Sequence, residues 1–382
     1  MFNQITLLSE ALIDDSDFIN LTDSNFARKE FFVLPKQLIK KQFNKYLSNR
    51  KYEPTATGDI NAKIALAKYY NGKGITADKS DYIITASTSE AYNIIFQTFS
   101  KGFDEALIPS PSYPLFSYLL KFNRISESKY TLNKDMNWEI NVKEFEDQIT
   151  KRTHFLILIN PNNPTGSFIP QKVFDELIKI CQKNKIFMIL DEVFSPYTNQ
   201  MLTFPPRKLI QTPIFVLNGI SKMFALPDLK VGWIFVYSSD NSTAIDKLET
   251  TNDVYLNCTT FSQSLIPILM DNLSEIQAPI IKRLANNRKI ISSFFKSNSA
   301  SFKFNGCDNG IHVFFGIKRN RLDEERFVIE LLKAEKVLIH PGYFYDFEDK
   351  SYNWFTFSYL ISPKALTLAL NRIKKFTTNF VS

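Results

Sequence analysis

Cysteine is scarce in this chain, which has three in 382 residues, at Cys181, Cys258 and Cys307. Their number is odd, their spacing is wide, and none has another Cys or a His nearby at the spacing of metal ligands. The sequence therefore gives no sign of a metal site. A reducing cytoplasm is the simplest location for such thiols, and we expect the protein to be cytoplasmic.

Targeting segments and long apolar runs are also missing. Residues 1–18 are acidic and lack a basic stretch, and no later segment reaches membrane-spanning length. No polar tract is long enough to indicate disorder. The net charge of +7 is spread along the chain instead of forming a basic arm, so we expect neither a membrane nor a nucleic-acid partner. An anionic ligand would account for part of this charge.

Short apolar runs alternate with helix-like segments in the first two thirds of the chain. Most of these runs are apolar at every position, which is typical of strands covered on both faces, and alternation with helices predicts a largely parallel sheet. The fold class expected is therefore α/β. The runs occupy residues 81–87, 105–109, 154–160, 186–191, 214–221 and 232–238, and the clearest helical spacing lies at 90–100 and 170–184.

The pattern changes after about residue 245. A long helical stretch at 274–297 is followed by strand-like segments at 310–318 and 354–360 and by a helix at 365–376. Because 382 residues exceed what one core usually fills, we predict two domains. The large α/β domain spans 46–250, and a smaller α+β domain combines 1–45 with 251–382.

Ligands of open α/β sheets gather beyond the carboxyl ends of the strands, so residues directly after the apolar runs are the first candidates. Ser221 and Lys222 end one run and precede an apolar loop. A lone lysine at a strand end is usually a solvated surface group. Partial burial, however, lowers the pKa of a lysine and frees its amine to attack a carbonyl, as a Schiff base requires.

Two segments resemble the signatures of the class I/II aminotransferases. SKMFALPDLKVGW at 221–233 is similar to their Schiff-base lysine segment, and NPNNPTG at 160–166 is similar to their second signature. The similarity extends from about Asn20 to the C-terminal helix. It implies fold type I, as in aspartate aminotransferase, the cofactor pyridoxal 5'-phosphate (PLP), and Lys222 as the catalytic residue that carries PLP as a Schiff base.

The resemblance also implies which residues contact the cofactor ring. Asp191 would hold the proton of the ring nitrogen, although an aspartate after a strand also often caps the next helix. Asn163 would hydrogen-bond the phenolic oxygen, whereas the same NPTG segment in isolation indicates only a turn. Tyr113 would stack on the ring, with ordinary core packing as the alternative. Tyr52 matches a tyrosine that reaches the phosphate of the neighbouring subunit, so a homodimer with shared active sites is implied.

The phosphate requires several donors in one place. Ser87, Thr88 and Ser89 follow a predicted strand and begin a helix, where backbone amides and the helix dipole favour an anion. The resemblance adds the hydroxyl of Ser221 and the cation of Lys230 to this cradle.

The sequence departs from the family at three positions. Lys230 replaces an arginine, and so keeps the charge without the bidentate fork. Phe194 replaces a tyrosine that donates to the phenolic oxygen. Thr356 occupies the position of the arginine that clamps the substrate carboxylate, and a threonine cannot replace a bidentate cation.

Two explanations of Thr356 stay open. Either the substrate has no carboxylate at that place, or another cation holds it, with Arg28 or Lys29 as possible suppliers. The segment NLTDSN at 20–25 resembles the substrate-side N-terminal stretch of the family, which places Ser24 and Asn25 near the substrate.

We predict a PLP-dependent aminotransferase that acts on an amino acid or amine, with a keto acid or aldehyde as acceptor. Fold alone does not choose a reaction, so other carbanion chemistry (a lyase, decarboxylase or cyclase) is an alternative. A non-catalytic PLP-binding sensor is a further alternative. Retention of Lys222, Asp191 and Asn163 argues against it, and so does the lack of room before residue 20 for a helix-turn-helix.

Overall fold

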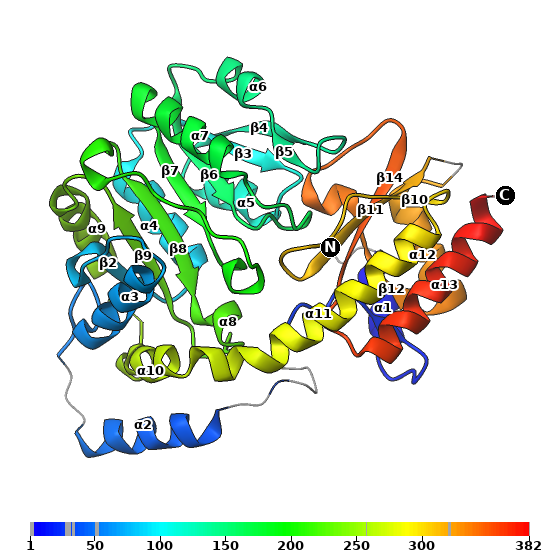
Figure 1. Ribbon diagram of the computed structural model, residues 1–382, viewed down its shortest axis with the longest axis horizontal. Coiled ribbons are helices and arrows are strands. Elements are labelled where there is room, and N and C mark those ends of the chain that lie inside the picture. Colours follow the sequence, from blue (N-terminus) through cyan, green and yellow to red (C-terminus); the bar gives the residue numbers. More distant parts are fainter. Residues whose placement is uncertain are drawn as a thin grey trace.

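Helix α11, Leu273–Ser297, runs from a large α/β part of the molecule to a smaller α+β part (Figure 1). The computed structural model describes residues 4–26, 32, 35–49, 53–256, 258–319 and 322–381. Both parts have a hydrophobic core of their own within these residues.

The large part is built on an eight-stranded sheet. Its strand order is β2-β9-β8-β7-β6-β3-β4-β5, and the pairs from β8 through β7, β6 and β3 to β4 are parallel. The three remaining pairs are antiparallel. In order of sequence, the strands are β2 Tyr82–Thr85, β3 Glu105–Ser110, β4 Ser126–Asn133, β5 Glu139–Ile140, β6 Thr153–Ile159, β7 Phe187–Asp191, β8 Ile214–Gly219 and β9 Gly232–Tyr237.

The apolar strands are covered on both faces because successive side chains point to opposite sides of the sheet. Ile84 and Leu158 pack in one core cluster with helices α3, α7 and α10, whereas Ile83 and Ile157 pack in another with α4, α5 and α9. All six predicted strands are present. The helices of this part are α3 Ile60–Gly72, α4 Thr88–Phe99, α5 Leu115–Phe122, α6 Val142–Asp147, α7 Gln171–Asn184, α8 Ile220–Met223, α9 Ser242–Val254 and α10 Thr260–Asp271.

The small part contains a four-stranded antiparallel sheet of order β10-β11-β14-β13. The N-terminal segment joins it, because β1 pairs with β12 and α1 packs on α12. Its elements are α1 Gln4–Ala11, β1 Ile19–Asn20, β10 Phe302–Phe304, β11 His312–Lys318, α12 Glu324–Glu335, β12 Val337–Leu338, β13 His340–Pro341, β14 Tyr352–Ser358 and α13 Pro363–Val381.

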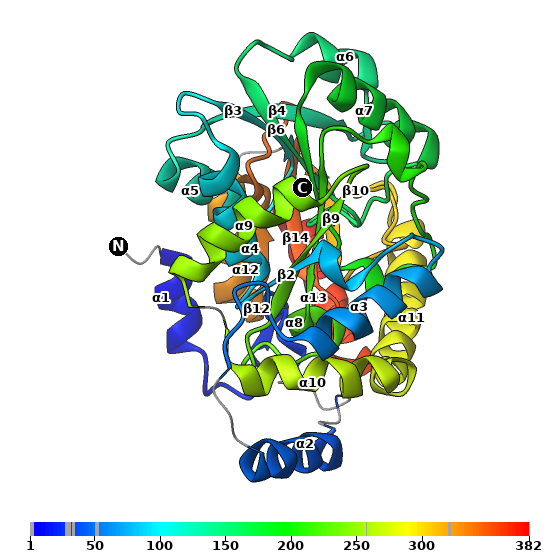
Figure 2. The ribbon, with the colours of Figure 1, turned by 90° about the vertical axis from the view of Figure 1, so that its left-hand side faces the viewer.

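The core clusters bear on the boundary between the two parts. Leu265 of α10 and Ile276 of α11 pack with the large part, whereas Ile280 and Leu284 of α11 pack with the small part. We therefore propose that the boundary lies within α11 and not at residue 250. Helix α2, Lys36–Ser48, buries none of its residues and lies below α10 in both views (Figures 1 and 2).

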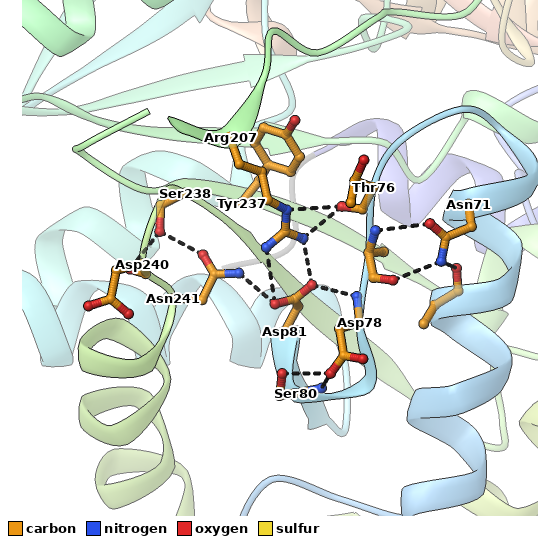
Figure 3. A network of polar contacts seen from close by, with 12 residues as sticks. Asn71, Thr76, Asp78, Ser80, Asp81, Arg207, Tyr237, Ser238, Asp240 and Asn241 are labelled. Atoms are coloured by element: carbon orange, nitrogen blue, oxygen red, sulfur yellow. Dashed lines mark hydrogen bonds and ion pairs between the residues drawn. The ribbon is translucent and has the colours of Figure 1, made fainter. Parts of the chain in front are cut away.

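A buried ion pair fixes the antiparallel edge of the large sheet (Figure 3). The Arg207 guanidinium donates to Asp81 over 2.5 Å and to the carbonyl of Thr76 over 2.7 Å. Asn241 also donates to Asp81, over 2.6 Å. These contacts join the start of β2 to the segment that precedes β8, which contains Arg207, and to the segment that follows β9, which contains Asn241. Within the described ranges, no helix has the length and apolarity needed to cross a membrane.

Candidate active site

A pocket of about 500 Å³ lies at the carboxyl ends of the central parallel strands, where they face the small part. Its walls come from both parts of the molecule. Residues that follow β2, β7 and β8 form one side, and residues of β11 and β13 form the other.

Lys222 extends into this pocket from α8, the short helix that follows β8. Burial lowers the pKa of its amine, and the charge of Asp23 opposes that shift. Nζ donates a hydrogen bond of 3.4 Å to the carbonyl of Ser24 and lies 5.8 Å from the ring of Phe26. A partly desolvated amine of this kind is a better nucleophile at neutral pH than a solvated lysine.

Asp191 is the last residue of β7 and is buried in the same pocket. Its Oδ1 accepts from the backbone N–H of Val193 and its Oδ2 from the hydroxyl of Tyr92, each over 3.0 Å. Burial raises the pKa of Asp191 to about 6, although both hydrogen bonds lower it. No described residue forms an ion pair with this carboxylate, so it fits a cationic ligand such as a protonated ring nitrogen.

The three asparagines of the 160–166 loop divide between folding and the pocket. Oδ1 of Asn160 accepts from the backbone of Ile169 over 2.9 Å, and Oδ1 of Asn162 accepts from the hydroxyl of Thr165 over 2.8 Å. Asn163 lines the pocket, and its buried Oδ1 has no partner in the part of the chain that the structure describes. Its amide is thus left for a ligand.

The N-terminus of α4 lies at the other end of the pocket and has the features of an anion site. Ser87 caps this helix by accepting from the backbone of Glu90 over 3.1 Å. Gly232 lets β9 approach closely, because a Cβ there would lie 2.7 Å from the carbonyl carbon of Ser87. Free backbone amides and the helix dipole attract an anion here. Thr88, Ser89, Ser221 and Lys230 line the same end.

These features fit PLP as a group: an amine, a buried carboxylate, a free amide and an anion cradle surround one cavity. Tyr113 also lines it and is 45% exposed. Phe194 lies in the wall, with its ring 6.0 Å from Lys222 Nζ.

The substrate residues predicted from the sequence divide into three groups. Ser24 lines the pocket, whereas Asn25 and Thr356 lie outside its lining. Thr356 is fully buried in β14, and its hydroxyl has no partner among the residues described. The third group, Arg28 and Lys29, lies outside the described residues. Tyr52, predicted to reach the phosphate of the neighbouring subunit, also lies outside them.

Several residues that line the pocket were not predicted from the sequence, among them Tyr92, His312, His340 and Tyr345. Tyr92 lies one turn after Thr88 on α4, so helical spacing could have found it. His312, His340 and Tyr345 come from the small part. The sequence alone indicates these three residues less clearly, because their approach to Lys222 depends on how the two parts pack.

Comparison with known proteins places this geometry in context. The family profile "Aminotransferase class I and II" matches residues 16–373. Nicotianamine aminotransferase B of Hordeum vulgare is 26% identical over 348 residues, which cover 88% of this chain and 61% of the relative. Tyrosine aminotransferase of Dictyostelium discoideum is 24% identical over 97% of this chain and 88% of its own length.

Solved structures agree in fold. Alanine aminotransferase from Pyrococcus furiosus superposes with a TM-score of 0.89 at 22% identity, over 98% of this chain and 96% of that one. A Thermus thermophilus aspartate aminotransferase mutant gives 0.85 at 19% identity, over 98% and 97% of the two chains. These likenesses confirm the predicted fold type I. The chain spans about 61% of the length of the Hordeum relative.

Proposed function

This chain belongs to the class I and II aminotransferase family, and from that premise we propose that it transfers an amino group from an amino acid or amine to a keto acid or aldehyde. The predicted cofactor, PLP, is the one that this family uses. Lys222 supports the proposal most directly, because its amine lies in the pocket together with Asp191 and Asn163 and burial lowers its pKa.

When bound, PLP supplies an electron sink for a carbanion formed next to the substrate nitrogen. Asp191 would keep a proton on the ring nitrogen, since its ionised carboxylate is held by Val193 and Tyr92. Asn163 would donate to the phenolic oxygen. The N-terminus of α4, with Ser221 and Lys230, would hold the phosphate.

Lys222 would have two tasks. Its Nζ would hold the cofactor covalently until the substrate amine displaces it, and the freed amine would then accept a proton from the substrate carbon and donate it to the carbon of the cofactor that receives the amino group. The low pKa that burial gives this amine suits both tasks, because a lysine that stayed protonated could not accept a proton.

The site for a substrate carboxylate is atypical in this proposal. Thr356 carries no charge, and the cations that line the described pocket, Lys222 and Lys230, have other tasks. Arg28 and Lys29 remain alternative suppliers of a cation. Replacing each with alanine should raise the KM for the true substrate and leave cofactor binding unchanged if either of them holds the carboxylate.

Other carbanion chemistry on the same fold is the second candidate. Phe194 favours it, because a phenylalanine at this place gives the phenolic oxygen no hydroxyl donor. The fate of the carbanion then depends on other groups of the pocket. Product analysis separates the two, because a transaminase leaves the amino group on the cofactor, whereas an eliminating lyase releases ammonia and a decarboxylase releases carbon dioxide.

We also propose a homodimer in the cytoplasm. Helix α2 supports the dimer, since Phe43 and Leu47 on it are 44% and 55% exposed and a second subunit would cover them. Cys181, Cys258 and Cys307 are free thiols, which supports a reducing location.

Borohydride reduction of the purified protein, followed by peptide mapping, tests the central assignment. We expect the reduced cofactor on Lys222 and a Lys222→Ala protein without covalent cofactor. A label on another lysine would overturn the assignment. Mixing the protein with a panel of amino acids and amines, while the cofactor spectrum is followed, then tests for amino transfer.

A further inference from the structure

Two of the three histidines in this chain, His312 and His340, line the active-site pocket. They come from β11 and β13, the two strands that flank β14. In the antiparallel register, His312 lies opposite Ser358 and His340 lies opposite Thr356. The two imidazoles thus adjoin the strand position where the family carries its arginine.

The four side chains share one face of the small sheet, since directly paired residues point the same way and so do residues two apart on a strand. Thr356 and Ser358 are 0% and 2% exposed, and neither hydroxyl has a hydrogen-bond partner in the described residues. Buried hydroxyls are costly without partners. Four polar side chains are therefore concentrated on the face of the small sheet that adjoins the pocket.

The imidazole rings are positioned by aromatic packing. His312 lies edge-on to Phe194 with ring centroids 5.8 Å apart, and His340 lies 5.5 Å from Phe344 and 6.3 Å from Tyr345. Neither ring makes a hydrogen bond with a residue that the structure describes. Their nitrogen atoms are consequently available to a ligand in the pocket.

Both rings are uncharged at neutral pH. Burial, together with the charges of Lys222 and His340, lowers the pKa of His312 to about 3, and burial lowers the pKa of His340 to about 4. Protonation of either ring is thus strongly disfavoured at pH 7. A neutral imidazole offers one donor and one acceptor, which suits a hydroxyl or carbonyl group better than a carboxylate.

We propose that His312 and His340 recognise an uncharged hydrogen-bonding group of the substrate at the place where other family members hold a carboxylate. The substrate class is then a primary amine that carries a hydroxyl or carbonyl group next to the reacting carbon. This inference rests on the proposed amino-transfer function. It develops the first of the two explanations of Thr356, in which the substrate has no carboxylate at that place, by naming the group that takes the place of the carboxylate.

Matched pairs of amines test the inference on the holoenzyme. L-alaninol and L-alanine, or L-phenylalaninol and L-phenylalanine, differ only in a hydroxymethyl group against a carboxylate. We expect the rate constant of cofactor amination, divided by the half-saturation constant, to be at least tenfold higher for the amino alcohol. His312→Phe and His340→Phe should each reduce this preference about tenfold, whereas His154→Phe, outside the pocket, should not. Equal or better reaction of the amino acids would overturn the proposal.

A second measurement does not depend on turnover. Because the chain has three histidines, ¹³C-labelled histidine gives three ring signals, which single substitutions assign. The His312 and His340 signals should stay at neutral-imidazole positions from pH 5.5 to 8 and should shift when an amino alcohol is added. An imidazolium signal on adding an amino acid would show a charged clamp and sink the idea. If no amine alters the cofactor spectrum, the proposed function fails, and these signals still decide whether the rings bind a neutral group.

Discussion

The hydroxyl of Tyr92 donates a hydrogen bond of 3.0 Å to Oδ2 of Asp191. This contact links α4, whose N-terminus forms the anion cradle, to the end of β7. Both groups are buried. The hydroxyl stabilises the ionised carboxylate and so opposes the effect of burial, which nevertheless raises the pKa of Asp191 to about 6. In the proposed PLP site, one side chain therefore links the end assigned to the phosphate with the end assigned to the ring nitrogen.

Tyr92→Phe should weaken cofactor binding. Removing one hydrogen bond to an ionised group costs about 1.5–3 kcal/mol, which corresponds to roughly a tenfold or greater rise in the PLP dissociation constant. Absorbance titration of the cofactor-free protein with PLP measures this dissociation constant. Tyr118→Phe is the control, since Tyr118 is 62% exposed and should tolerate the change. An unchanged constant for Tyr92→Phe would show that the contact does not support the cofactor.

Gly232→Ala should disturb the anion cradle. The new Cβ would lie 2.7 Å from the carbonyl carbon of Ser87 and 2.8 Å from the backbone nitrogen of Thr88, so the start of α4 must move. We expect a loss of about 1–3 kcal/mol in the free energy of unfolding and weaker PLP binding. Gly72→Ala, at the end of α3, has no atom within 4 Å of its added Cβ and should be neutral or stabilising. Equal effects of the two changes would refute this account.

Asp81→Asn should destabilise the protein without affecting the site. The substitution keeps the shape but leaves Arg207 without a charged partner in a contact whose carboxylate side chain is 5% exposed (Figure 3). We expect a loss of roughly 2–4 kcal/mol in denaturant unfolding, with PLP affinity unchanged. Lys183→Gln breaks an exposed pair with Glu146 and should cost less than about 1 kcal/mol. Comparable losses would mean that burial does not set the strength of the pair.

Much of the large part could be predicted, because its central strands are buried on both faces and read as continuous apolar runs. Strand β4, Ser126–Asn133, was missed since most of its side chains are exposed or half-buried, which leaves no such run. Part of the site could be predicted for a related reason. Asp191 is the last residue of an apolar strand, Lys222 and Asn163 follow shortly after the ends of two others, and sheet geometry brings strand ends together.

The small-domain wall could not be predicted in the same way. His312 and His340 reach the pocket only through the pairing of β11 and β13 with β14 and through the packing of the two parts. Neither relationship is local in sequence. Thr356 was identified as an unusual residue from its position in the sequence, but the polar groups around it become visible only in three dimensions.

His312 should make the cofactor-free protein sensitive to acid. Its folded pKa of about 3 lies below the unfolded value of 6.5, so the unfolded chain binds the proton first and stability falls as pH decreases from 6.5 toward 3. The free energy of unfolding that this residue contributes falls by up to about 1.4 kcal/mol per pH unit. Denaturation at pH 5 to 7.5 should therefore show a shallower pH dependence for His312→Phe than for the unmodified protein. Parallel curves would contradict the assignment, and His154→Phe should have a smaller effect.

The variant Thr356→Arg tests whether α-amino acids are poor substrates only because the arginine that holds the substrate carboxylate is missing. Thr356 is 0% exposed, with Phe314 and His340 opposite it on the neighbouring strands, so a single arginine would be buried without a partner. We expect this variant to lose several kcal/mol of stability. The double variant Thr356→Arg/His340→Ala removes the adjacent ring and opens a route for the guanidinium into the pocket. It should aminate its cofactor with L-alanine at least tenfold faster than the unmodified protein, because a bidentate ion pair is restored. His340→Ala alone is the control and should show no such gain. If the double variant folds, binds PLP and still fails to react faster with L-alanine, the absence of an arginine at position 356 is not what sets the substrate class.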